Sequence, residues 1–270
     1  MKVGFIGAGN MVGAIVRGAV ASEGLKASDI YLTDRSGKSA PKLAEEVGAN
    51  VSESNEALAR SVDVVVLGVK PYAIEGVLTE ISGALADSGA LVISLAAGKP
   101  LAALERAAGG EIPVIRVMPN VNAAIGESMT GIAAGTHATA EHISQAKQIM
   151  STVGRYLVIE ESEFSIFAAL AGSSPAWMYQ IVESFARAGV KHGLTKDQAV
   201  AIVAQSMAGS AQMILDQAAS EGATPSDLVD RVCSPGGTTI AGLLAAEQAG
   251  LTPVLVSAVD AAVRRDRELA

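Results

Sequence analysis

The most constraining feature of the sequence is a glycine-rich turn close to its N-terminus. The apolar run "VGFI" has the length of a buried strand, and "MVGAIVRGAVA", just beyond the glycines of "GAGN", has apolar residues at helical spacing. A strand that passes through a glycine turn into a helix is the opening of a β-α-β unit, whose strands are parallel. This turn alone predicts an α/β fold.

Short β-branched runs recur through the first half of the chain, separated by segments of helical length. The runs are "IYLTD", "VDVVVLGV", "ALVISLAAG" and "PVIRVMPN", and two more, "TGIAAG" and "RYLVIE", extend the pattern to about Ile159. Strands that alternate with helices are typical of a parallel sheet with right-handed crossovers.

The pattern changes beyond Glu163, where apolar residues recur only at helical spacing. Three helix starts are marked by threonines, one in a capping box and two before a proline: Thr195, Thr224 and Thr252. We therefore expect an α/β domain over residues 1–160 and an all-helical domain over residues 161–270.

The helical half carries more apolar surface than a small domain buries by itself. An apolar stripe runs through "FAALAGSSPAWMYQIVESFA", and the Ala- and Met-rich "VAIVAQSMAGSAQMI" follows it. We expect this half to form a homodimer. The alternative is a self-contained helical bundle.

Charge and rare residues argue against several classes of function. The 270 residues carry a net charge of −8 without a cluster of Lys or Arg, so no nucleic-acid partner is expected. One Cys and three scattered His offer neither a disulfide nor metal-ligand spacing, so no metal site is expected. No apolar run approaches the roughly 20 residues of a membrane span, and a strand that starts at Val3 leaves no room for a signal peptide. We expect a cytoplasmic protein with no membrane partner.

The glycine turn matches the dinucleotide-binding pattern in its first two positions. Gly7 permits the tight turn, and Gly9 lets the backbone at a helix N-terminus approach a pyrophosphate. The third position departs from the pattern, since it is Val12, followed by Gly13. The turn predicts that residues 1–160 form a Rossmann-like domain that binds NADP(H) or NAD(H).

The end of the second predicted strand leaves the choice of cofactor open. Asp34 stands where a carboxylate accepts hydrogen bonds from the ribose hydroxyls of NAD. Arg35, Ser36 and Lys38 follow it and suit the 2′-phosphate of NADP, although a turn with solvated charges is the alternative. Three other loops lie at carboxyl ends of predicted strands and would complete the pocket: "GVKP", "SLAAG" and "MPN". The alternative is that each is only a turn between a strand and a helix.

A second candidate site lies near the C-terminus, where "CSPGGTT" precedes the helical segment "IAGLLAAEQAG". The amides of Gly236, Gly237, Thr238 and Thr239 would point outward at the helix start and bind a carboxylate without any basic residue. The alternative is an ordinary helix cap.

Together these motifs resemble one family. "GFIGAGNM", "VKP", "SLAAG", "IRVMPN", "ALAGSSPAW" and "VCSPGGTTIAGL" occur in the order found in pyrroline-5-carboxylate reductase, an enzyme of proline synthesis, and span the chain. The resemblance implies a domain that binds NADPH or NADH, followed by a helical domain that exchanges helices in a homodimer whose interface carries the substrate site. It also implies that dimers assemble further, commonly into decamers.

The resemblance implies site residues as well. Together with Asp34, Arg35 and Ser36, the expected cofactor positions are Gly7, Gly9, Asn10, Met11, Asn55, Val69, Lys70, Pro71, Ala96, Ala97 and Asn120. The expected substrate positions are Ser234, Gly236, Gly237, Thr238 and Thr239. The chain departs from the family in "GSSPAW", where "GSGPAY" is common, and at Asp34, where many members carry Asn or Ser.

The implied reaction is the reduction of the cyclic imino acid 1-pyrroline-5-carboxylate to L-proline. A protonated iminium carbon accepts hydride readily, so the reaction needs no metal, nucleophile or acid-base pair. Thr239 is the expected catalytic residue, because its hydroxyl could hydrogen-bond the ring nitrogen. A β-hydroxyacid dehydrogenase is one alternative, but it needs a Lys that "AGSSPAWMYQ" lacks. A reductase-like binding or regulatory protein without activity is the other.

Overall fold

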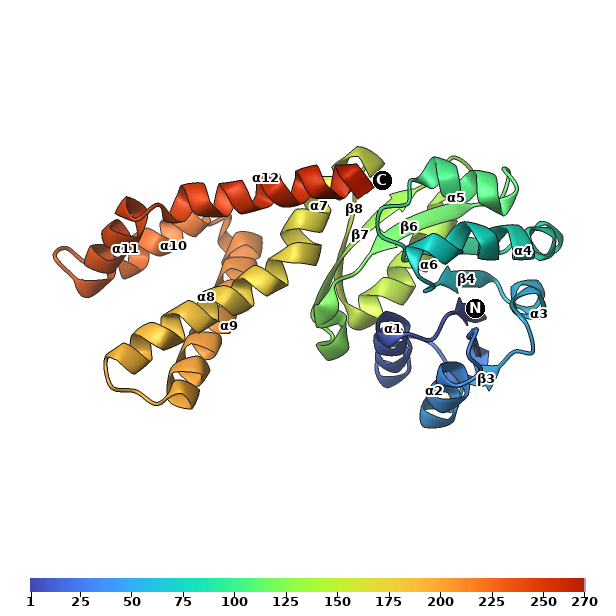
Figure 1. Cartoon of the computed structure of the whole chain (residues 1–270), viewed down its shortest axis with the longest axis horizontal. Coiled ribbons are helices and arrows are strands. Elements are labelled where there is room, and N and C mark those ends of the chain that lie inside the picture. The colour runs from blue at the N-terminus through green and yellow to red at the C-terminus, as the bar shows by residue number, and fades with distance from the viewer. Residues whose placement is uncertain (270) are drawn as a thin grey trace. The chain divides into compact units, whose positions relative to one another are not determined.

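The computed structural model describes residues 1–269, and its first part is built on one eight-stranded sheet (Figure 1). The strand order is β3-β2-β1-β4-β5-β6-β7-β8. Strands β1 to β6 are parallel, β7 is antiparallel to β6, and β8 is parallel to β7. The strands are β1 Val3–Ile6, β2 Ile30–Thr33, β3 Asn50–Val51, β4 Val64–Leu67, β5 Leu91–Ser94, β6 Val114–Met118, β7 Ser128–Ala134 and β8 Gly154–Val158.

Helices cover both faces of this sheet, and the alternation of side chains along each strand shows why. In β4, Val64 and Val66 pack with residues of α1, α2 and α6, whereas Val65 and Leu67 pack with residues of α3, α4 and α5. Strands buried on both faces are typical of a doubly wound sheet, which confirms the α/β prediction. The helices are α1 Asn10–Ala21, α2 Ser39–Val47, α3 Asn55–Ser61, α4 Ile74–Ser88, α5 Leu101–Ala108 and α6 Ala140–Met150.

The remainder of the chain is helical, as expected. A short helix passes into a π-helix, Ala168–Ser173, in which the backbone hydrogen bonds span five residues instead of four. The α-helices are α7 Phe164–Phe167, α8 Ser174–Lys191, α9 Lys196–Glu221, α10 Pro225–Val232, α11 Thr238–Gln248 and α12 Leu251–Leu269.

The chain divides into two compact units. The first holds residues 1–172 together with the end of the chain from Ala262, and the second is Ser173–Ala261. The division falls inside the π-helix. The domain boundary that we place at residue 160 stays a prediction.

A partly buried ion pair fastens the segment after β8 to the sheet of the first unit. Arg116, on β6, lies 3.2 Å from Oε1 of Glu161 and stacks 4.1 Å from the ring centre of Phe164. The same carboxylate oxygen accepts from the amide of Leu101 at 2.6 Å. Phe164 is 2 % exposed, so the start of the helical region belongs to the core of the first unit.

The second unit has almost no core of its own. Of residues 173–261, all of which the structure describes, only Pro175, Ala186 and Ala199 are buried. Large apolar side chains are instead exposed, among them Phe185 at 61 % and Val254 at 63 %. A folded unit of this kind needs further apolar surface to pack against.

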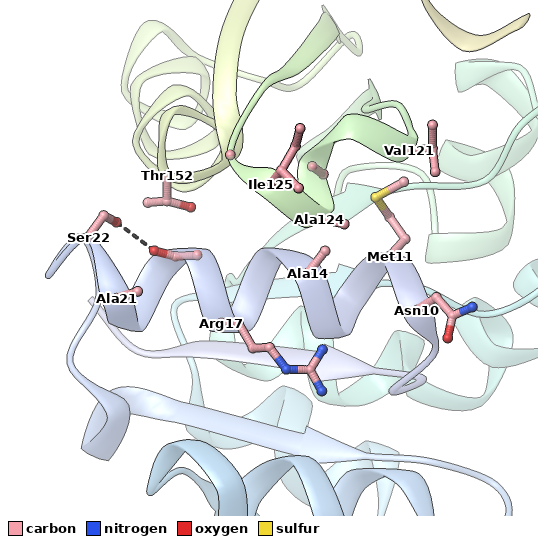
Figure 2. Close-up of a pocket in the computed structure, with 13 residues that line it drawn as sticks. Asn10, Met11, Ala14, Arg17, Ala21, Ser22, Val121, Ala124, Ile125 and Thr152 are labelled. Atoms are coloured by element: carbon pink, nitrogen blue, oxygen red, sulfur yellow. Dashed lines mark hydrogen bonds between the residues drawn. The ribbon is translucent and has the colours of Figure 1, made fainter. Parts of the chain in front are cut away.

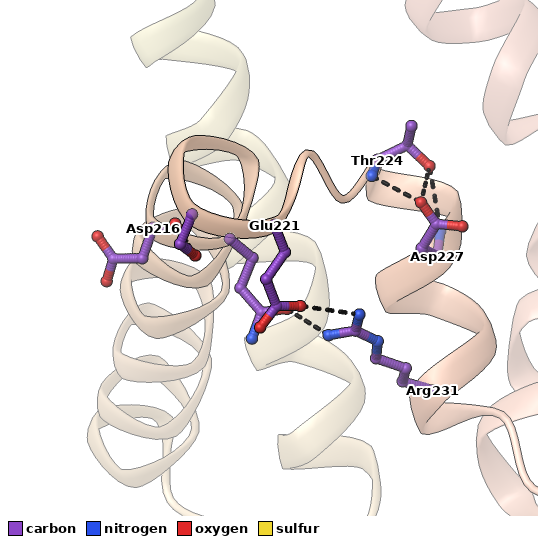
Figure 3. A network of polar contacts seen from close by, with 7 residues as sticks. Asp216, Glu221, Thr224, Asp227 and Arg231 are labelled. Atoms are coloured by element: carbon purple, nitrogen blue, oxygen red, sulfur yellow. Dashed lines mark hydrogen bonds and ion pairs between the residues drawn. The ribbon is translucent and has the colours of Figure 1, made fainter.

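Two of the three predicted threonine caps are confirmed. Thr195 caps α9 and Thr224 caps α10, each in a capping box whose side chains bond in both directions. Figure 3 shows the bonds between Thr224 and Asp227. Hydrogen bonds from Thr224 lower the pKa of the Asp227 carboxyl below its usual value.

The third predicted cap is wrong. Helix α12 starts at Leu251, so Thr252 lies inside the helix rather than before it. The turn residue is Gly250, whose φ of 94° lies in the left-handed region. A glycine there bends the chain between α11 and α12 without help from a threonine side chain, so the helix begins earlier.

Within residues 1–269, no single helix is long and apolar enough to cross a bilayer. One pair, Thr238–Gln248 with Leu251–Glu268, reaches the required length and composition only when both helices are counted across a bend of 52°.

Candidate functional site

The carboxyl ends of β1 and β4 meet where the order of strands reverses, which is where an open α/β sheet binds its ligand. Gly7 follows β1 with φ at 94°, and its amide donates to the carbonyl of Thr33 at 2.8 Å. A Cβ at Gly7 would lie 3.0 Å from the carbonyl carbon of Gly68, just after β4. Both the backbone angle and this close approach require glycine at position 7.

Val12 replaces the third glycine of the pattern because Gly68 makes room for it. A Cβ at Gly68 would lie 2.2 Å from Cγ2 of Val12, and Val12 is 1 % exposed. The valine side chain occupies the space beside the backbone of Gly68. Helix α1 therefore packs closely on the sheet although the pattern is incomplete.

Gly9 is not required by the chain itself. It is the N-cap of α1, with φ at −80° and ψ at −175°, an extended conformation that any residue adopts. A Cβ there would meet no atom within 4 Å. The open space lies over the first turn of α1, where backbone amides without helical partners bind phosphate groups. This position fits a dinucleotide that approaches the backbone.

A cavity of about 630 Å³, which we call the strand-end cavity, opens beside the carboxyl ends of β1, β2 and β4. Its volume and its mixture of apolar and charged side chains suit one half of a dinucleotide. Of the expected cofactor residues, the structure brings six to this cavity: Gly7, Asp34, Arg35, Asn55, Val69 and Lys70.

Asp34 has a role that the sequence did not reveal. Its Oδ1 accepts from the amide of Ala40 at 3.0 Å, and its Oδ2 accepts from the hydroxyl and the amide of Ser36. Burial raises the pKa of the Asp34 carboxyl, but these hydrogen bonds outweigh burial and hold the pKa below its usual value. The carboxylate thus shapes the turn that presents Arg35 and Ser36. Its contact with a ribose stays a prediction.

Asn55 begins α3 and is held on both sides within the cavity. Its Oδ1 accepts from the hydroxyl of Thr33 at 2.8 Å, and its Nδ2 donates to Glu80. The predicted contact with the adenosine end of the cofactor would use the N–H group and the acceptor site of the Asn55 amide that these bonds leave over.

A second cavity, of about 800 Å³, lies on the outer face of α1. Figure 2 shows Met11 pointing from α1 toward the turn that carries Val121, Ala124 and Ile125. Asn10 also lines it, so two expected cofactor residues lie along this cavity rather than the strand-end cavity.

Six expected cofactor residues line neither cavity: Gly9, Ser36, Asn120, Pro71, Ala96 and Ala97. Ala96 is buried and its amide donates to the hydroxyl of Ser94 at 3.2 Å, whereas Ala97 and Pro71 are exposed. Pro71, Ala96 and Ala97 follow strands β4 and β5 at the same edge of the sheet. Their contact with a cofactor stays a prediction.

Asn120 is 7 % exposed, and its polar groups are engaged within the first unit. Its backbone amide donates to Ser128 Oγ at 3.0 Å, and its Oδ1 accepts from the amide of Asn122 at 3.1 Å. Its Nδ2 donates to the carbonyl of Ala171, in the π-helix, at 3.0 Å. Asn120 therefore fastens the loop after β6 to the π-helix, a role that its position in "MPN" did not indicate.

The candidate substrate loop, Ser234 to Thr239, lies in the second unit and leads into α11. Gly236 has φ at 66°, which favours glycine. The amide of Gly237 donates to the carbonyl of Ser234 at 3.0 Å, so it does not point outward as we expected. The amides left for an anion are those of Gly236, Thr238 and Thr239.

A larger residue at position 237 would disturb the loop before it reached any ligand. A Cβ there would lie 2.4 Å from Oγ and 3.1 Å from the carbonyl oxygen of Ser234. Substitution of Gly237 is therefore a poor probe of substrate binding. The side chains of Thr238 and Thr239, by contrast, are exposed.

Comparison with known proteins identifies the family. Residues 161–269 match the family model described as pyrroline-5-carboxylate reductase dimerisation, and residues 2–98 match that of NADP oxidoreductase, coenzyme F420-dependent. The chain is 37% identical over 276 residues to a pyrroline-5-carboxylate reductase of Methanosarcina acetivorans. The aligned region covers 99% of this chain and 97% of that relative. The chain belongs to the pyrroline-5-carboxylate reductase family.

Solved structures of the reductase family share the fold over the full length. That of Coxiella burnetii superposes with a TM-score of 0.93 at 33% identity, covering 100% of this chain and 98% of the other. The pyrroline carboxylate reductase of Plasmodium falciparum, solved with NADP bound, has a TM-score of 0.85 at 29% identity and covers 100% and 98%. The family resemblance stated from the motifs is confirmed, as is the order of a Rossmann-like domain and a helical one.

Two residues of the site, Thr33 and Glu80, were missed by sequence reasoning, as was the packing role of Gly68. Thr33 and Glu80 hold Asn55, and Gly68 receives Val12. Each acts through a contact between segments that are distant in sequence. Gly68 was expected at the pocket as the first residue of "GVKP", but nothing in that loop indicated its contact with Val12.

Proposed function

We propose that this chain reduces 1-pyrroline-5-carboxylate to L-proline, the last step of proline synthesis, with NADPH or NADH as the reductant. The observation that carries the proposal is the similarity to pyrroline-5-carboxylate reductases over 99% of the chain, including both candidate ligand loops. Neither non-enzymatic binding nor a β-hydroxyacid dehydrogenase is favoured by a comparable match.

The cofactor is assigned to the first unit. When bound, NADPH or NADH supplies the hydride. The open backbone at Gly9 supports a pyrophosphate at the N-terminus of α1. The strand-end cavity supports the adenosine end, with Asn55 near the ribose and Arg35 as the cation for a 2′-phosphate. Met11 and the loop after β6 are assigned to the nicotinamide end.

The substrate is assigned to the loop of the second unit. The amides of Gly236, Thr238 and Thr239, at the start of α11, would hold the carboxylate of the cyclic imino acid. The hydroxyl of Thr239 would hydrogen-bond the ring nitrogen and orient the carbon that accepts hydride. Thr238 is assigned no role for its side chain.

Purified protein should oxidise both NADPH and NADH, and only when the cyclic imino acid is present. Asp34 is engaged by its own turn, so its charge opposes a 2′-phosphate less than a free carboxylate would, and Arg35 and Lys38 lie close by in sequence. Steady-state rates with each cofactor test this. Absence of turnover would overturn the proposed function. A preference for one cofactor above about 1000-fold, roughly 4 kcal/mol, would show that either Asp34 or the pair Arg35 and Lys38 does not act on the 2′-phosphate as proposed.

The helical unit is proposed to assemble the protein at least into dimers. Residues 161–269 match a dimerisation family, and the unit buries only three residues by itself. Decamers of such dimers and a cytoplasmic location are further proposals, which follow from the family resemblance.

Light scattering at micromolar protein concentration should give the mass of a dimer or a larger assembly, because the exposed apolar side chains of the second unit need a partner. A fragment that ends at Gly172 tests whether the helical unit is responsible for assembly. Its end point keeps Phe164 in the core of the first unit, whereas a cut after Glu160 would remove that residue. We expect that fragment to lack reductase activity and to be monomeric or to aggregate. A well-behaved monomer of the full chain would contradict the proposal.

A further inference from the structure

Glu80, on α4, lines the strand-end cavity, although neither the dinucleotide pattern nor the family motifs single it out. Its two carboxylate oxygens lie 3.2 and 3.4 Å from Nδ2 of Asn55. On the other side of Asn55, the hydroxyl of Thr33 donates to Oδ1 at 2.8 Å. Side chains from β2, α3 and α4 thus form one series of hydrogen bonds along the cavity.

Glu80 determines which way the amide of Asn55 faces. A carboxylate only accepts hydrogen bonds, so it must face Nδ2 and not Oδ1. The hydroxyl of Thr33 could not impose this orientation by itself, because a hydroxyl both donates and accepts. Without Glu80, the Asn55 amide could turn over and still bond to Thr33.

We propose that Glu80 is a positioning residue for the cofactor, which acts by holding the Asn55 amide in one orientation. The inference rests on the proposed function, under which Asn55 contacts the adenosine ribose. An asparagine amide has two N–H donors and two acceptor sites. Glu80 and Thr33 use one of each, so one N–H and one acceptor site remain for a ligand.

The remaining groups serve both cofactors. A 2′-hydroxyl can donate and accept, so it can use either group, and a 2′-phosphate can accept from the N–H. Without Glu80 the amide could take either orientation, and a cofactor of either kind would have to fix it in one orientation on binding, so NADH and NADPH binding should weaken to a similar degree.

A direct effect of the Glu80 charge would act differently. A carboxylate near a 2′-phosphate repels it, so its removal would favour NADPH alone. Glu80 is exposed, however, and water screens such a charge. The hydrogen bond to Asn55 acts at contact distance and is not weakened in the same way, which favours positioning over repulsion.

The test is calorimetric titration of the full-length protein with NADPH and with NADH. Glu80→Ala is expected to raise both dissociation constants about fivefold, the effect of one ordinary hydrogen bond. Alanine is the best helix former, so α4 should remain folded. Glu45→Ala, at an exposed position of α2 outside the cavity, removes the same atoms and charge and should leave both constants unchanged.

A double-variant cycle shows whether Glu80 acts through Asn55. In an Asn55→Ala background, Glu80→Ala should change either dissociation constant by less than about 1.5-fold. Tighter NADPH binding with NADH unaltered, or effects that multiply fully in the double variant, would overturn the inference. Absence of cofactor binding to the unaltered chain would overturn it together with the proposed function, whereas binding without turnover would count against the proposed function alone.

Discussion

Gly9→Ala is expected to weaken the binding of NADPH and NADH by about 100-fold or more in a chain that remains folded. The added methyl group meets no atom of the protein within 4 Å and stands over the first turn of α1, where a pyrophosphate would approach. Loss of two charge-assisted hydrogen bonds, at about 1.5 kcal/mol each, amounts to about 3 kcal/mol, or roughly a factor of 100.

The stability of this variant should change little. The backbone angles at Gly9 are open to alanine, so the only cost is that of a poorer N-cap, about 1 kcal/mol or less. Calorimetric titration with both cofactors, together with thermal unfolding, measures the two effects separately. Gly83→Ala, which also adds a methyl group into open space but inside α4, should leave cofactor binding unaltered. Unimpaired binding by the Gly9 variant would show that no ligand approaches the backbone there.

Thr239→Ala should lower kcat/KM for the cyclic imino acid by about 5- to 150-fold, equivalent to roughly 1–3 kcal/mol of transition-state stabilisation. The hydroxyl is proposed to bond the ring nitrogen, so its removal affects turnover while cofactor binding barely changes. No hydrogen bond of this hydroxyl is found within residues 1–269, and alanine suits the first turn of α11, so the fold should not suffer.

Thr238→Ala is the matched comparison for that measurement. Its neighbour acts through a side chain, whereas Thr238 is assigned only a backbone amide, which alanine retains. Steady-state kinetics of the two variants should therefore differ, with Thr238→Ala within a few-fold of the unaltered chain. Equal damage by both substitutions, or a loss of cofactor affinity in Thr239→Ala, would show that this loop does not bind the substrate nitrogen and carboxylate.

Much of the fold was predictable because its signals are local. An apolar run of four residues, a glycine turn and a helical stripe each lie within a short window, so the main strands and the helical half could be found from the sequence. Strand β3 could not, since Asn50–Val51 is only two residues long and half exposed. The antiparallel direction of β7 depends on its pairing with β6, which no local pattern specifies.

The candidate site was predictable to the extent that ligands impose a residue type. Gly7 could be found because a tight turn leaves few choices, and Gly9 is predicted on the ground that a close phosphate would do the same. Asp34 and Asn120 were found as positions, but their bonds to Ala40 and Ala171 depend on how the chain folds back on itself. Their roles in binding stay predictions.

The contact between Val12 and Gly68 links two positions that a sequence alignment treats as independent. Because the side chain at position 12 occupies the volume that any side chain at position 68 would need, a valine in one admits only glycine in the other. A homologue with glycine at position 12 would lack this clash, and alanine at position 68 would then need only a small shift away from the carbonyl oxygen of Gly7 at 3.0 Å, so the sizes of the two residues should covary during evolution. A motif search that demands a third glycine will overlook chains of this kind, although their cofactor turn is intact.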